Sequence, residues 1–152
     1  MQVKSLGNIV VTLIVFPIAL FSRSPEEPWR VNGARLNAHI QKLHSIAKQT
    51  SPDSSRVAFS ESDLAGRKYV IQLMRAAGLT TRIDYAGNII GRREGSEGDL
   101  PPIMLGSHID SVPHGGRYDG PVGVMAAVEV AHTLFENKHR TRHPLEIIIF
   151  IN

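Results

Sequence analysis

The residues best suited to chemistry lie between Gly106 and Gly120, in the segment GSHIDSVPHGGRYDG. His108 and Asp110 stand on alternate positions at the end of an apolar strand, and residues two apart on a strand point to the same side. His108 could offer one ring nitrogen to a divalent metal while Asp110 accepts a hydrogen bond from the other. The loop glycines would let the chain bring Asp119 back over the strand end, where its two oxygens could bridge two metal ions.

A purely structural explanation of the same residues is equally open at this point. HxD is a common pattern, so His108 and Asp110 could form a solvated loop pair, with Asp119 only capping the next helix. His114 and Arg117 lie in the same loop and are weaker candidates for contacts with a substrate. The glycine cluster lacks the GxxxxGK pattern of a phosphate-binding loop.

Two helices and a β-hairpin are predicted upstream of these residues. Apolar residues recur at helical intervals over residues 31–47 and again over 60–77. Residues 81–85 and 88–92 are short strand candidates on either side of Ala86-Gly87, which indicates a hairpin. These elements would form the support beside the candidate site.

Around the candidate site the expected order is strand, helix, strand. Residues 103–105 form an apolar strand that leads into His108, and Pro121 suits the first turn of a helix. The β-branched run 145–151 is typical of a central parallel strand covered on both faces. This order is a βαβ unit, so the sequence predicts an α/β fold.

Composition argues against several classes of site and partner. The chain has no cysteine, which excludes disulfides and thiolate metal ligands. Removing Lys4 and Arg23 from the net charge of +3 leaves +1, so nothing supports nucleic-acid binding.

Residues 1–24 carry an apolar run over 6–21 behind Lys4, which we interpret as a signal peptide for export to the periplasm, the medium or the ER lumen. The alternative is a membrane anchor formed by residues 6–21, which would be the chain's one contact with a membrane.

The run over residues 106–124 resembles the di-metal amidohydrolase family that contains N-carbamoyl-L-amino-acid hydrolases, allantoate amidohydrolases and β-ureidopropionases. This family lies within the larger clan of co-catalytic metallopeptidases and aminoacylases. The resemblance covers nearly everything from Trp29 onward, including DYAGNIIGR at 84–92 and HPLE at 143–146. It implies that residues 25–152 are the N-terminal portion of a mixed-sheet metallohydrolase catalytic domain.

The resemblance also implies roles for individual residues. His108 would be a ligand to one of two divalent metal ions, Asp119 the bridging ligand, and Asp110 the catalytic residue that orients His108. The ions would be Zn²⁺ or Mn²⁺, with Co²⁺ and Ni²⁺ as further candidates. The intact enzyme would hydrolyse a linear amide or ureido C–N bond in a small molecule such as an N-carbamoyl amino acid or allantoate. It would be a homodimer.

The sequence departs from the family pattern after residue 151. A Glu-Glu pair is expected there, one glutamate as general base and the other as ligand, but Asn152 is the last residue. Because catalytic zinc sites typically have three protein ligands, we expect a truncated enzyme that binds metal weakly and has no turnover by itself. The alternatives are an aminoacylase or dipeptidase of the same clan, or a non-catalytic exported remnant.

Overall fold

The computed structural model describes residues 29–151, so the predicted signal peptide at residues 1–24 lies outside it. Three helices and four strands follow one another as two helices, a hairpin and a strand–helix–strand unit, which confirms the predicted α/β class and element order. The elements are α1 Gly33–Thr50, α2 Glu61–Ala76, β1 Thr80–Ile83, β2 Ile89–Arg93, β3 Ile103–His108, α3 Pro121–Glu136 and β4 Leu145–Phe150. No helix within residues 29–151 is long and apolar enough to cross a membrane.

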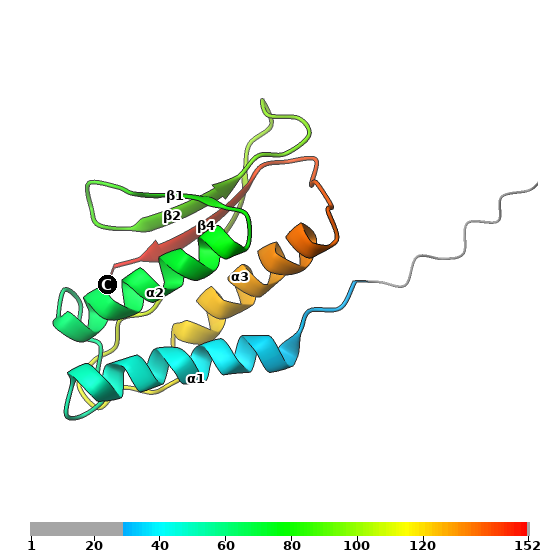
Figure 1. Ribbon diagram of the computed structural model, residues 1–152. Coiled ribbons are helices and arrows are strands. Elements are labelled where there is room, and N and C mark those ends of the chain that lie inside the picture. Colours follow the sequence, from blue (N-terminus) through cyan, green and yellow to red (C-terminus); the bar gives the residue numbers. More distant parts are fainter. Residues whose placement is uncertain (1–28, 152) are drawn as a thin grey trace, which may run out of the picture.

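The four strands form one mixed sheet in the order β1-β2-β4-β3. The central position predicted for residues 145–151 is confirmed, but β4 is parallel only to β3 and antiparallel to β2. Within residues 29–151 all three helices lie on the same side of the sheet (Figure 1), so coverage of the second face stays a prediction. Ile147 and Ile149 are buried in the core, whereas Phe150 points to the other face and is half exposed. An apolar run shows that a strand is central without showing which neighbours it takes.

The hairpin prediction is confirmed, with a longer turn than expected. Asp84 accepts hydrogen bonds on its Oδ1 from the backbone N–H groups of Ala86 and Asn88, at 3.0 and 2.9 Å. Gly87 has φ of +95°, which glycine adopts without steric cost. The side chain of Asp84 thus stabilises a turn that is longer than the predicted two-residue connection at Ala86-Gly87.

The helices are arranged in two layers beneath the sheet (Figure 1). The inner layer consists of α2 and α3, which pack on the strands, and α1 packs on these two helices. Arg35 of α1 reaches α3, where Nε donates to Glu129 Oε2 at 2.8 Å and Nη1 to Glu136 Oε1 at 2.6 Å. The Glu129 side chain is 2% exposed, so α1 is joined to α3 by an ion pair with one fully buried partner.

The core continues past the end of β3. Ile109 is 1% exposed and belongs to the apolar cluster between helices and sheet, although it follows the last residue of the strand. Its side chain enters this cluster, whereas the side chains of the residues before and after it line a pocket. The candidate residues His108 and Asp110 are these two neighbours.

Candidate active site

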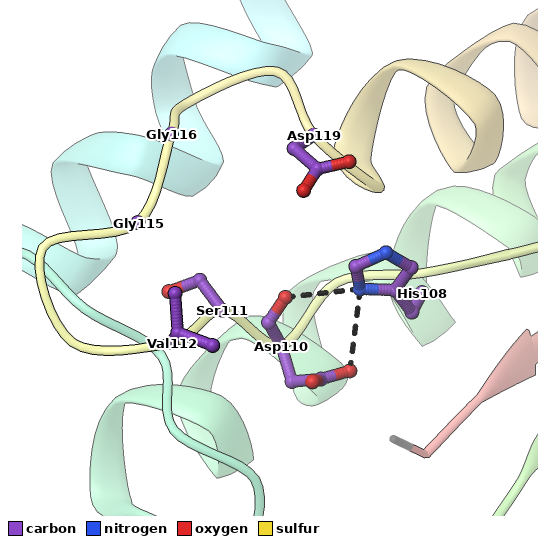
Figure 2. A pocket seen from close by; sticks show the side chains of 7 residues that line it. All are labelled: His108, Asp110, Ser111, Val112, Gly115, Gly116 and Asp119. Atoms are coloured by element: carbon purple, nitrogen blue, oxygen red, sulfur yellow. Dashed lines mark hydrogen bonds and ion pairs between the residues drawn. The ribbon is translucent and has the colours of Figure 1, made fainter.

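His108 lies at the end of β3 with its ring held against Asp110. The ring Nδ1 is 3.1 Å from the main-chain carbonyl oxygen of Asp110 and 3.5 Å from the carboxylate Oδ1 (Figure 2). Both partners are acceptors, so Nδ1 is the nitrogen suited to carry the proton and Nε2 is left as a lone-pair donor. The sequence predicted a hydrogen bond from the ring to the Asp110 carboxylate, whereas the hydrogen-bond contact is to the carbonyl oxygen and the carboxylate lies at ion-pair distance.

Asp110 is buried, with 7% of its surface exposed. Its Oδ1 has no hydrogen-bond partner among residues 29–151. The contact to His108 Nδ1 at 3.5 Å is longer than a hydrogen bond, and a buried polar atom without one costs roughly 1–3 kcal/mol, which is a reason to expect a further partner at this position. The burial also argues against the alternative of a solvated loop pair.

Asp119 faces the pocket and does not cap α3. The N-cap of α3 is Gly120, with φ of +82°, and no side chain caps this helix. Ser107 Oγ donates to the carbonyl oxygen of Gly120 at 3.0 Å, so the helix start is tied directly to β3. Figure 2 shows the Asp119 carboxylate across the pocket from His108 and Asp110. The structure therefore removes the capping explanation for Asp119.

The three predicted site residues line one pocket of about 150 Å³. The complete lining is His108, Asp110, Ser111, Val112, Gly115, Gly116 and Asp119. The strand end supplies the first part of this list and the glycine-rich loop supplies the rest. A pocket of this size with one imidazole and two carboxylates suits small cations better than an apolar ligand.

The two weaker candidates lie outside this lining. His114 is exposed, with φ of +56°, and its backbone N–H donates to Asp53 Oδ2 at 3.4 Å. Arg117 reaches α1, where Nη1 donates to Gln41 Oε1 at 2.8 Å. Hydrogen bonds from Ser51 and Ser55 hold the pKa of Asp53 well below its usual range. These contacts fasten the loop to its surroundings, and a substrate role for His114 or Arg117 stays a prediction.

Sequence reasoning missed Arg56, which lies in the loop before α2. Its side chain is 1% exposed, and Nε donates to the carbonyl oxygen of Ile109 at 2.7 Å. Arginine is rarely fully buried, and a polar loop predicts exposure. No local pattern around Arg56 signals this contact, because its partner is 53 positions away.

The side chains of the pocket are of the types that bind divalent metals, but within residues 29–151 they are too few for a complete site. Imidazole nitrogen and carboxylate oxygen are suitable ligands for zinc and manganese. Within residues 29–151, however, no group of three or more His, Cys, Asp or Glu side chains is placed to hold a metal ion. His108 and Asp119 can therefore supply part of a metal site only.

Comparisons with known proteins match a peptidase family over part of the chain and amidohydrolases over most of it. Residues 88–152 match the model of Peptidase family M28. A ureidoglycolate hydrolase from Arabidopsis thaliana is 42% identical over 120 residues, and an N-carbamoyl-L-amino acid amidohydrolase from Geobacillus stearothermophilus is 41% identical over 120 residues. Each alignment covers 79% of this chain.

Solved structures of amidases are similar to the chain as well. A hydantoinase/carbamoylase family amidase from Burkholderia ambifaria superposes with a TM-score of 0.76 at 36% identity, over 82% of this chain. The chain is homologous to these amidohydrolases. The resemblance predicted from residues 106–124 is thereby confirmed, as is the mixed-sheet fold. The chain spans 25% and 29% of the two sequence relatives and 30% of the solved amidase.

Proposed function

We propose that the pocket at the end of β3 is part of the active site of a metal-dependent amidohydrolase acting on a linear amide or ureido C–N bond. One observation carries this proposal: His108, Asp110 and Asp119 line the same pocket, while Gly120, not Asp119, is the N-cap of α3. The names of the homologous enzymes favour an N-carbamoyl amino acid or ureidoglycolate-like substrate.

In this proposal each residue has a defined task. His108 Nε2 and the Asp119 carboxylate would hold divalent ions, with Zn²⁺ or Mn²⁺ as the leading candidates. Such ions, when bound, act as Lewis acids toward a carbonyl oxygen. Asp110 keeps the ring of His108 oriented through the two contacts to Nδ1, which would leave Nε2 free to bind an ion.

The residues described here do not complete such a centre. A catalytic zinc site needs about three protein ligands, and a hydrolase also needs a group that transfers a proton to the leaving nitrogen. We propose that donors outside residues 29–151 supply both. Export directed by residues 1–24 and assembly as a homodimer are further parts of the proposal, and both rest on sequence alone.

Weak metal binding can be measured directly on the chain by adding MnCl₂ to ¹⁵N-labelled protein. We expect paramagnetic broadening to begin at the amides of residues 107–110 and 119–120, and to be lost in Asp119→Asn and His108→Gln. The control is His143→Gln, because His143 bonds to the carbonyl of Pro101 and does not line the pocket. Equal broadening in the wild type and Asp119→Asn would contradict the proposed metal site.

The substrate class is tested by a segment exchange. The aligned 120 residues, which are 41% identical between the two proteins, would replace their counterpart in the Geobacillus stearothermophilus amidohydrolase. We expect the hybrid to release ammonia from an N-carbamoyl amino acid, and the same hybrid with Asp119→Asn to be inactive. A folded hybrid that cleaves only dipeptides would instead favour the aminoacylase or dipeptidase alternative.

A further inference from the structure

Arg56 holds the chain on both sides of Asp110. Its Nε donates to the carbonyl oxygen of Ile109 at 2.7 Å. Its backbone N–H donates to Ser111 Oγ at 2.9 Å, and its carbonyl oxygen accepts the N–H of Ser111 at 2.8 Å. Three hydrogen bonds from one residue therefore fix the positions immediately before and after Asp110.

The charge of Arg56 is compensated only partly. Its guanidinium is always protonated, and burying such a group without compensation is costly. The carboxylates that interact with it electrostatically are those of Asp63 and Asp110, both buried. Asp63 Oδ2 accepts the backbone N–H of Phe59 at 3.0 Å. Arg56 Nη2 and Asp110 Oδ1 are both buried without a hydrogen-bond partner among residues 29–151.

The side chain of Arg56 has little room to move. It passes over Gly66 of α2, where an added Cβ would lie 3.5 Å from Arg56 Cδ and 3.6 Å from Ile109 Cδ1. The same Cβ would lie 3.1 Å from Leu43 Cδ1, which is a tight contact. The packing of α1 and α2 therefore determines where the guanidinium lies beside the segment after β3.

We infer that Arg56 is a positioning residue of the active site, which sets the orientation of the His108 ring by fixing the main chain over residues 109–111. Asp110 contacts Nδ1 through its carbonyl oxygen and its carboxylate, so any shift of this segment changes both contacts. The catalytic importance of this role rests on the proposed function. The orientation itself can be measured without metal.

The experiment uses Arg56→Met, Arg56→Lys and Ser111→Ala in the full 152-residue chain. The first readout is the ¹⁵N spectrum of the His108 ring in metal-free protein, which reports which nitrogen carries the proton. We expect the proton on Nδ1 in the wild type, a mixture of tautomers in Arg56→Met and partial recovery in Arg56→Lys. The second readout is Mn²⁺ affinity, which should fall about 10- to 100-fold in Arg56→Met, as for other residues that orient metal ligands.

The control is Arg142→Met, because Arg142 pairs with Glu97 on the surface and both side chains are more than half exposed. It should change neither readout. A folded Arg56→Met protein with the wild-type tautomer would overturn the inference. If Arg56→Met does not fold, the wild-type tautomer in both folded Arg56→Lys and folded Ser111→Ala would also overturn the inference. A change of tautomer in Arg56→Met, in a protein whose wild type binds no Mn²⁺ at His108, would count against the proposed metal site while supporting the positioning role.

Discussion

Replacing Gly120 by alanine tests how closely the start of α3 packs against the candidate ligand. Gly120 has φ of +82° and ψ of −60°, a region that residues with a Cβ rarely occupy. A Cβ at this position would lie 2.6 Å from both the carbonyl oxygen and the Cε1 atom of His108. The carbonyl belongs to β3, so it cannot move away as the end of a flexible side chain would.

The expected cost has two parts. Holding a non-glycine residue in such a backbone region costs about 1–3 kcal/mol. Forcing extra volume against fixed neighbours costs about 1–3 kcal/mol more. We therefore expect Gly120→Ala to lower the free energy of unfolding by about 3 kcal/mol, and to weaken Mn²⁺ binding because the His108 ring must be displaced.

The assay is urea unfolding followed by far-UV circular dichroism, with Gly98→Ala as the matched control. Gly98 has nothing within 4 Å of an added Cβ, so this substitution should change the free energy of unfolding by less than about 1 kcal/mol. If the two variants are equally stable, the tight packing of α3 on His108 is refuted.

Three further predictions concern the frame of the site. Arg35→Met should destabilise the protein by about 3 kcal/mol near pH 7, because it leaves Glu129 buried without its partner. Burial raises the pKa of Glu129, but hydrogen bonds led by Arg35 outweigh this and lower it. The wild type should therefore lose this stabilisation as the pH falls below about 4.5, and the difference between the two proteins in urea unfolding should shrink in acid; a constant difference would contradict this assignment. Ser60→Ala removes the hydroxyl that accepts the N–H of Asp63 and should cost about 1 kcal/mol, a loss that an unchanged thermal midpoint would exclude. Arg142→Met should alter the free energy of unfolding by less than about 1 kcal/mol in the same urea assay, since its partner Glu97 is exposed, and a larger loss would show that this pair is not a simple surface contact.

The sequence alone determined the elements whose causes are local. Helix α2 begins at the Ser60 cap, and it ends where Gly78 adopts φ of +78° and the N–H of Leu79 donates to the carbonyl of Met74 at 3.0 Å. Such signals depend on residues within one or two turns of each other, so they can be read without the fold. The candidate ligands could be predicted from the sequence for a similar reason, because His108 and Asp119 lie within one short segment.

Only the tertiary structure decided the features that join distant parts of the chain. The antiparallel pairing of β4 with β2 connects residues more than 50 positions apart. The apolar sequence of β4 does not indicate whether a neighbouring strand runs parallel or antiparallel to it. Arg56 is buried because the chain brings it against Ile109. The carbonyl of Asp110 contacts the His108 ring next to Ile109, whose side chain is buried in the core. Contacts of this kind depend on how the core closes, and that is a property of all the elements together.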